Sequence, residues 1–249
     1  MIPAAVLESI NGACEANVAY GAPHVELVPS GLPQLDAAIG GVPRGRIIEI
    51  YGLEGSGKTV LALHLAQQLG GPVLYIAADH VLSPYILGEL ELYLLDVPSM
   101  EDALDACRTV AVGGFAAIVL DTVAALPTNE DLWNSINDVG PLRERQAQVM
   151  AKALPGLAGL LHKTGCSLIL VNQMREKPGI VYGNPYYPTG GKAIGYFAAL
   201  RLWVRMIERI KVRREIIGQV MAVDVRKCKY GPPGICATVN LVYGEGMRT

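Results

Sequence analysis

Short apolar runs rich in β-branched residues alternate along this chain with longer segments that have the spacing of helices. The apolar runs are RIIEIYG (46–52), PVLYIAA (72–78), FAAIVLDTV (115–123) and CSLILVNQ (166–173). The helix-like stretches between them cover residues 60–70, 102–112 and 143–164. Near-continuous hydrophobic strands that alternate with helices are typical of a parallel sheet covered on both faces. The pattern therefore predicts an α/β fold with a mostly parallel, twisted sheet flanked by helices.

The pattern changes after residue 198, where three strand-like segments succeed one another without a helix between them. They cover residues 200–213, 219–230 and 238–246. We expect them to extend the sheet as antiparallel strands. At the other end, residues 1–29 favour a weak helix followed by a short strand at 24–28. The predicted division is a short N-terminal segment, 1–29, and one core domain, 30–249.

Composition fits one sizeable domain and argues against several other classes of protein. Of the 249 residues, 51% are hydrophobic and 18% are charged, which supports a full core. The five cysteines form no CxxC pair, so buried thiols in a reducing cytoplasm are favoured over disulfides or a metal site. No apolar run could span a bilayer and the N-terminus lacks a basic signal region, so we expect a soluble cytoplasmic protein without membrane contacts. The net charge of −2 argues against a globally basic nucleic-acid binder but leaves a local basic surface open.

The clearest chemical signal is GLEGSGKT (52–59), which lies between a predicted strand and a predicted helix. Glycines at 52, 55 and 57 let successive backbone N–H groups point into one concavity, and the helix N-terminus adds its positive dipole end. This is the pattern that cradles the phosphates of ATP. Lys58 can reach the β- and γ-phosphates, and the Thr59 hydroxyl can ligate Mg²⁺. The predicted nucleotide contacts in this segment are Gly52, Leu53, Glu54, Gly55, Ser56, Gly57, Lys58, Thr59 and Val60.

A second acidic position supports the same site. The strand IVLDT (118–122) ends in Asp121, which suits a carboxylate that orients Mg²⁺ through its water shell. Thr59 and Asp121 are therefore the predicted metal residues. ATP and Mg²⁺ are the predicted cofactors.

Together with motifs further along the sequence, these residues make the chain resemble the bacterial RecA recombinases from about Ser30 to Met247. The marks are GVPRGRIIEIYGLEGSGKT (41–59), VLDTVAAL (119–126), VNQMREKPGIVYGNPYYPTGGKAI (171–194) and LVYGEG (241–246). The resemblance implies a RecA-type P-loop ATPase core over 30–249, with an oligomerisation segment over 1–29. It also implies filament formation on single-stranded DNA, ATP at the interfaces between subunits, and strand exchange with duplex DNA as a further partner.

The resemblance also assigns two DNA-binding loops. Gln173 would sense the γ-phosphate and pass its state to the main DNA-binding segment, Met174 to Gly191. Cationic and aromatic groups interleaved on a Gly/Pro-rich loop suit single-stranded DNA. The predicted contacts there are Arg175, Lys177, Tyr182, Asn184, Gly190 and Gly191. A shorter loop, 131–145, would contribute Arg143 and Arg145, although Gly140–Pro141 replace the Met-Gly pair that the family usually carries near its tip.

Basic residues gather in the C-terminal strands. At period two, the first of these strands would place one basic set on a single face, namely Arg201, Arg205, Arg209, Lys211 and Arg213. A solvated strand face paired with nearby acids is the alternative interpretation. On the next strand, the family pattern K-x-K implies that Lys227 and Lys229 reach the ATP of a neighbouring subunit, as an arginine finger does.

The chain departs from the family pattern at several positions. Asp79 stands where the family has its general base, a Glu, and the shorter side chain predicts slow hydrolysis. The family's adenine-stacking tyrosine has no residue in register, with Ile86 there and Tyr85 one residue earlier. Tyr243 and Gly244 match the other adenine neighbours. The chain stops at Thr249, where the family usually continues into a C-terminal domain.

These features predict a RecA-like, DNA-dependent ATPase whose catalytic residues are Lys58, Asp79, Gln173, Lys227 and Lys229. The main alternative is a catalytically weakened relative that binds ATP and DNA and modulates a full-length recombinase. A helicase-like hexamer or a KaiC-like protein on the same core is a more distant alternative.

Overall fold

The computed structural model describes residues 25–78, 92–134, 142–176 and 186–248. One large sheet with the strand order β12-β11-β10-β9-β3-β7-β6-β4-β5 crosses this part of the chain, and β8 pairs with β7. Its first strands in the chain are β3 (Ile47–Gly52), β4 (Val73–Ala77), β5 (Leu92–Leu95), β6 (Ala117–Asp121), β7 (Ser167–Glu176) and β8 (Tyr186–Pro188). The remaining strands are β9 (Leu200–Val212), β10 (Glu215–Cys228), β11 (Cys236–Val242) and β12 (Gly246–Arg248). A small separate ladder joins β1 (Leu27–Val28) to β2 (Val42–Pro43).

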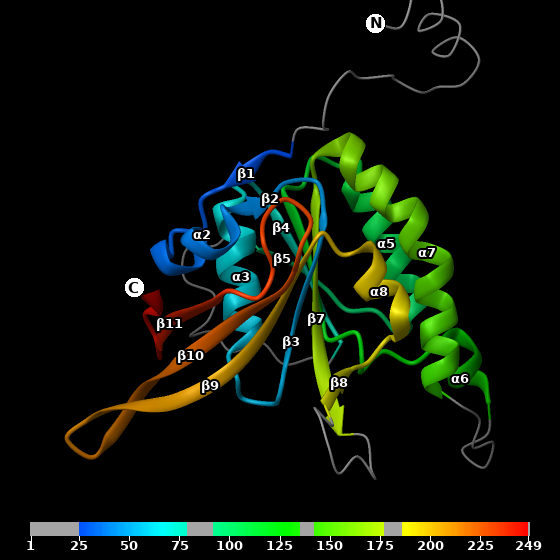
Figure 1. The fold of residues 1–249 in the computed structure, drawn as a ribbon. Coiled ribbons are helices and arrows are strands. Elements are labelled where there is room, and N and C mark those ends of the chain that lie inside the picture. The colour runs from blue at the N-terminus through cyan, green and yellow to red at the C-terminus, as the bar shows by residue number, and fades with distance from the viewer. Residues whose placement is uncertain (1–24, 79–91, 135–141, 177–185, 249) are drawn as a thin grey trace, which may run out of the picture.

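Helices cover both faces of the sheet, as the alternating pattern predicts (Figure 1). On one face, α2 (Pro33–Ile39) and α3 (Lys58–Gln68) pack over a core of fully buried aliphatic side chains. On the other face lie α5 (Met100–Ala111), α7 (Leu142–Thr164) and α8 (Gly191–Phe197), over a second buried cluster. The short helix α6 (Asn129–Trp133) follows β6 near the N-terminal end of α7. The predicted α/β architecture is confirmed.

The C-terminal strands differ in two ways from their prediction. β9 lies parallel to β3, so the antiparallel part of the sheet begins with the β9–β10 pair. The segment predicted as one strand over 238–246 ends at Val242, and a turn with Gly244 at φ +83° leads into β12. The turn requires a left-handed backbone at Gly244, which a strand pattern does not reveal.

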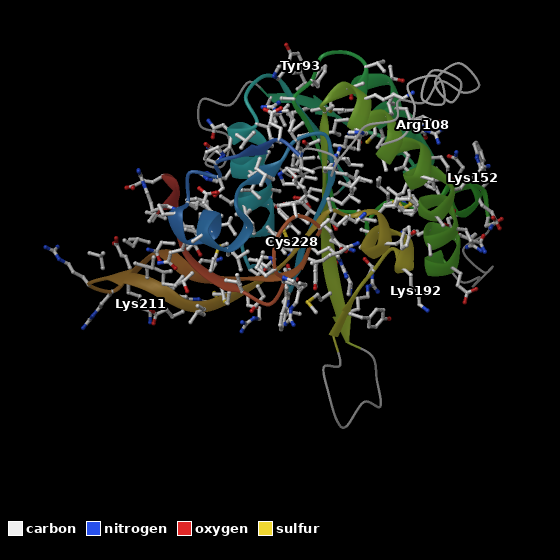
Figure 2. The ribbon with its side chains drawn as sticks, turned by 45° about the horizontal axis from the view of Figure 1, so that its top comes forward. Tyr93, Arg108, Lys152, Lys192, Lys211 and Cys228 are labelled. Carbon is white, nitrogen blue, oxygen red and sulfur yellow. The ribbon has the colours of Figure 1, made fainter. Side chains whose placement is uncertain are left out.

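The predicted single basic face on β9 is wrong. Opposite residues in an antiparallel pair share a face, and Arg205 pairs with Ala222 while Arg209 pairs with Gln219. Ala222 and Gln219 lie three positions apart on a continuous stretch of β10, so they point to opposite faces. The register skips Ile207, and this bulge turns the following residues over. The basic side chains are therefore divided into Arg201 and Arg205 before the bulge, and Arg209 and Lys211 after it. Figure 2 shows Lys211 near the far end of the projecting β9–β10 hairpin.

Candidate functional site

The segment between β3 and α3 forms a tight loop that requires glycine at its two ends. A β-carbon at Gly52 would lie 2.2 Å from the carbonyl oxygen of Val204 on β9. Gly57 has a φ of +90° and serves as the N-cap of α3, where no side chain caps the first turn. Gly57 therefore offers the first N–H groups of α3 no side-chain acceptor, and the N-terminus of a helix in this position is suited to bind an anion.

The two predicted metal residues lie together at the end of β6. The Thr59 hydroxyl donates a hydrogen bond to Oδ2 of Asp121 at 2.5 Å, and Tyr75 donates to the same oxygen at 3.1 Å. Asp121 is buried. A hydroxyl and a carboxylate are oxygen ligands of the kind that Mg²⁺ prefers, so these residues fit the predicted cofactor. Sequence reasoning missed Tyr75, because its position reads as an ordinary core position of a strand.

Lys58 folds back over the loop. Its Nζ donates to the carbonyl oxygen of Leu53 at 2.8 Å. Burial lowers the pKa of Lys58, while the nearby Asp121 and Glu54 carboxylates oppose that shift. Ser56 Oγ is buried and has no hydrogen-bond partner within the described part of the chain. The loop thus offers an ammonium group and a hydroxyl that could both turn to a bound phosphate.

A glutamine that the sequence did not single out joins the loop to the predicted adenine neighbours. Gln219 on β10 is buried, and its Nε2 donates to the Gly55 carbonyl oxygen at 3.2 Å. The Tyr243 hydroxyl donates to Oε1 of Gln219 at 3.4 Å. Tyr243 and Gly244 follow β11 directly, so this turn lies at the same end of the sheet as the phosphate loop. A polar residue beside the apolar run 220–223 was the available signal.

The predicted γ-phosphate sensor adjoins the phosphate loop. Gln173 on β7 pairs with Gly52 on β3, and its side chain is exposed. β7 continues to Glu176 and returns antiparallel in β8, where Arg175 pairs with Tyr187. The predicted DNA-binding segment therefore begins as a β-ribbon that leaves the sheet beside the phosphate loop (Figure 1). The predicted contacts Lys177, Tyr182 and Asn184 lie outside the described residues.

The segment ends at two glycines that packing and backbone both require. Gly190 and Gly191 have φ values of +78° and +77°. A β-carbon would lie 2.6 Å from Ile194 Cδ1 at the first position and 2.6 Å from Ala147 Cβ at the second. Beside them, a cavity of about 640 Å³ opens between α7, α8 and β8. Its lining includes both glycines together with Glu144, Lys192 and Arg201.

The side chain of Arg145, a predicted DNA contact, is engaged by carboxylates of the same chain. Its Nε donates to Oδ1 of Asp131 at 2.6 Å, and its Nη1 lies 3.7 Å from the Glu130 carboxylate. Burial would raise the pKa of Asp131, but hydrogen bonds from Thr128 and Arg145 outweigh it and lower that pKa. Arg145 therefore anchors α6 to α7 in this arrangement. The side chain of Arg143 lies outside the described residues.

The two predicted trans lysines differ in their surroundings. Lys227 donates from Nζ to the carbonyl oxygens of Gly195 at 2.7 Å and Tyr196 at 2.8 Å, at the C-terminal end of α8. Burial lowers the pKa of Lys227, and the neighbouring cations Lys229 and Arg201 lower it further. The side chain of Lys229 is exposed.

One tryptophan and two arginines form a cation–π stack across β9 and β10 that the sequence did not predict. The guanidinium carbons of Arg205 and Arg226 lie 4.7 Å and 4.3 Å from the ring centroid of Trp203. Arg205 also forms an ion pair with Asp224 at 2.8 Å. This part of the basic surface is therefore fixed by cation–π contacts and an ion pair, which favours the solvated-face interpretation for Arg205.

Two predicted nucleotide-site residues, Asp79 and Tyr85, lie outside the described residues. Within the described part of the chain, no helix is both long and apolar enough to cross a membrane.

Comparisons with known proteins agree with this geometry. A family profile described as the RecA N-terminal domain matches residues 15–248. Protein RecA of Caldanaerobacter subterraneus subsp. tengcongensis is 40% identical over 237 residues, which cover 90% of this chain and 68% of that protein. Protein RecA of Clostridium perfringens (strain 13 / Type A) is 40% identical over 240 residues, with 91% and 67% covered. Protein RecA of Acholeplasma laidlawii is 42% identical over 241 residues, with 91% and 72% covered.

A solved structure shares the fold. The crystal structure of the RadB recombinase matches with a TM-score of 0.65 at 18% sequence identity. The match covers 89% of this chain and 98% of that one.

Proposed function

This chain belongs to the RecA family, and from that membership we propose that it is a DNA-dependent ATPase that forms filaments on single-stranded DNA. A RecA-type ATPase core and a role in recombination and repair come with the family. The finer proposal is that ATP and Mg²⁺ lie at the interfaces of a cytoplasmic homo-oligomer. In that state the filament pairs with duplex DNA and exchanges strands.

One observation carries the proposal. Gly52, the first residue of the phosphate loop, pairs in register with Gln173, the residue immediately before the predicted DNA-binding segment. The two segments thus leave neighbouring parallel strands at the same edge of the sheet. Ligands of open α/β sheets bind at this carboxyl edge, so nucleotide and DNA would meet one continuous piece of structure.

The residues at the nucleotide end have distinct roles in this proposal. Lys58 would leave the Leu53 carbonyl oxygen, to which it bonds at 2.8 Å, and neutralise the β- and γ-phosphates. Thr59 and Asp121 would hold Mg²⁺, which withdraws charge from the phosphates when bound. Gln219 would keep the loop and Tyr243 in fixed relation, because it bonds to both.

At the DNA end, the cations and glycines have separate tasks. Arg175 lies in the β7–β8 ribbon, where it can reach a phosphate. The N–H groups of Gly190 and Gly191 lie beside the cavity and can approach a backbone closely, because neither residue carries a side chain. Arg143, Lys177, Tyr182 and Asn184 stay predicted contacts of this surface.

Lys227 and Lys229 are proposed to act on the ATP of a neighbouring subunit. Lys229 is exposed, whereas Lys227 has to give up two hydrogen bonds to α8 before it can reach outward. Assembly would therefore have to move α8 or supply a stronger partner for Lys227. A phosphate is such a partner, because its full negative charge attracts the ammonium group more strongly than neutral carbonyl oxygens do.

A second candidate function is a weakened relative that binds ATP and DNA and modulates a full-length recombinase. The observation that favours it is Asp79 in place of the family's general-base Glu. The shorter side chain would hold the attacking water about 1 Å too far away, which can cost about 100-fold in rate.

Fluorescence anisotropy of a labelled oligothymidylate, with and without a non-hydrolysable ATP analogue, tests the proposal. Tight DNA binding that depends on the analogue and disappears in Lys58→Ala is the expected result, with filaments visible by electron microscopy. Absence of DNA binding in the wild-type chain, despite normal binding of the analogue, would contradict it. DNA binding without self-assembly would favour the second candidate.

A further inference from the structure

A buried set of polar side chains lies directly beneath the root of the predicted DNA-binding segment. Asn172, Glu49 and Thr189 are all buried, with 0%, 1% and 6% of their surface exposed. Asn172 Nδ2 donates to Glu49 Oε1 at 3.0 Å and to the Thr189 carbonyl oxygen at 2.8 Å. The Thr189 hydroxyl donates back to Asn172 Oδ1 at 2.5 Å. Both amide hydrogens and the amide oxygen of Asn172 are thus engaged, which fixes its orientation.

This set connects the phosphate-loop strand to both ends of the DNA-binding segment. Glu49 lies on β3, which leads into the phosphate loop at Gly52. Asn172 lies two residues before the segment starts at Met174, and Thr189 stands immediately before the two glycines where it ends. The Thr189 N–H also donates to the Gln173 carbonyl oxygen at 3.2 Å. A shift of β3 relative to β7 would therefore move the end of the DNA-binding segment as well as its start.

Arg201 extends the connection to α8. Its Nε donates to Glu49 Oε2 at 2.5 Å, and its guanidinium carbon lies 5.2 Å from the ring centroid of Tyr51 on β3. A β-carbon at Gly195 in α8 would lie 3.2 Å from Nη1 of Arg201, so the two are in close contact. Glu49 therefore links, through its two oxygens, the root of the segment and the helix that follows it.

Filling the space between these strands with buried polar side chains is energetically unfavourable compared with apolar packing. A buried carboxylate is unfavourable unless it is paired and hydrogen-bonded, and apolar residues of similar size would pack these strands without that cost. A fully satisfied polar network selects one arrangement of its backbones more sharply than apolar contacts do. The network is therefore suited to holding a geometry rather than to stabilising the sheet.

We propose that Glu49, Asn172 and Thr189 are positioning residues that couple the nucleotide state of the phosphate loop to the C-terminal end of the DNA-binding segment. Gln173 would act at the N-terminal end of the segment, whereas this network acts at Gly190, Gly191 and α8. The inference rests on the proposed function, because it needs a nucleotide and DNA to couple. Coupling between two ligands is reciprocal, so DNA should tighten nucleotide binding by the same factor by which nucleotide tightens DNA binding.

Thr189 offers a test with a matched control. Thr189→Val keeps the shape of the side chain but removes the hydroxyl that bonds to Asn172, whereas Thr189→Ser keeps the hydroxyl. The measurement is a full binding cycle with a labelled oligothymidylate and a fluorescent, non-hydrolysable ATP analogue, each titrated with and without the other. In Thr189→Val the coupling factor should fall about fivefold to tenfold, in line with the loss of one buried hydrogen bond. Thr189→Ser should stay within about twofold of the wild type.

The other arms of the cycle separate positioning from a merely structural role. Analogue affinity without DNA should change less than about twofold in Thr189→Val, because the lost hydroxyl bonds to Asn172 and not to a residue of the phosphate loop. The coupling factor is a ratio, so a change in DNA affinity that is the same with and without the analogue leaves it unchanged. An unchanged coupling factor in Thr189→Val, or equal losses in all four affinities, would overturn the inference while leaving the proposed function intact. A wild-type chain that binds the analogue but no DNA would overturn both.

Discussion

Replacing Gly57 by alanine should weaken the fold and the binding of nucleotide, because a β-carbon has no room at this position. It would lie 2.4 Å from Met221 Sδ and 3.1 Å from Gln219 Nε2. The backbone φ is +90°, which L side chains rarely adopt. Gly55 is a matched control, since its φ is +70° and no described atom lies within 4 Å of the place its β-carbon would take.

The two substitutions differ by one physical effect. A left-handed backbone costs an L residue about 1–2 kcal/mol at either position. At position 57 the β-carbon must also displace Met221, which is fully buried, and overpacking of this kind costs about 1–3 kcal/mol more. Gly57→Ala should therefore lower the free energy of unfolding by about 2–5 kcal/mol, against about 1–2 kcal/mol for Gly55→Ala. In a chain of this size, the difference corresponds to about 2–12 °C in melting temperature.

Thermal unfolding of both variants, with and without Mg²⁺ and ADP, provides the assay. The wild-type chain should gain stability from the nucleotide, and Gly57→Ala should gain less, because the displaced Met221 and Gln219 no longer support the loop. Equal melting temperatures for the two variants would refute the packing argument. So would a Gly57→Ala variant that gains as much from the nucleotide as the wild type does.

Three further predictions concern other parts of the site. Asp121→Asn should reduce the Mg²⁺-dependent part of ATP-analogue affinity by about tenfold, because it removes the negative charge of the carboxylate that would hold the metal. A titration of the analogue with and without Mg²⁺ measures this change, and an unchanged Mg²⁺ dependence would contradict it. Gln219→Leu should weaken analogue binding about fivefold by leaving the Gly55 carbonyl without its amide donor, which calorimetry can measure; wild-type affinity would rule out that role. Burial raises the pKa of Asp131, but hydrogen bonds from Thr128 and Arg145 outweigh this effect and lower the folded-state pKa below its ordinary 3.8. The ionised Asp131 side chain therefore stabilises α6 above about pH 4, and this stabilisation is lost as the pH falls through the lower folded-state pKa. Hydrogen exchange in α6 should show this acid-induced loosening, and Asp131→Asn should lack it.

Much of the fold could be predicted from local patterns in the sequence. The strands at 47–52, 117–121 and 167–176 coincide with the predicted apolar runs, because buried parallel strands must be almost wholly apolar. The phosphate loop is equally local, since one octapeptide supplies both the turn and its chemistry. Thr59 and Asp121 lie 62 positions apart, yet their contact could be predicted from the topology, because both stand at the carboxyl edge of the sheet.

The features that the sequence did not predict depend on contacts between distant segments. The bulge at Ile207 arises from the pairing of β9 with β10, so period-two alternation within β9 could not show that Arg205 and Arg209 face opposite ways. Arg145 looks like a free cation until Asp131 is placed beside it. The link between Glu49 and Asn172 joins residues 123 positions apart, and each alone reads as an isolated polar residue in a strand.

DNA-dependent ATP hydrolysis is tested most directly by the rate of hydrolysis by the wild-type chain with and without single-stranded DNA, beside Lys58→Ala. We expect hydrolysis to rise on addition of DNA, to stay slow because the Asp79 side chain is short, and to be absent in Lys58→Ala. Hydrolysis that DNA does not change at all would contradict the claim that nucleotide and DNA act through one continuous site.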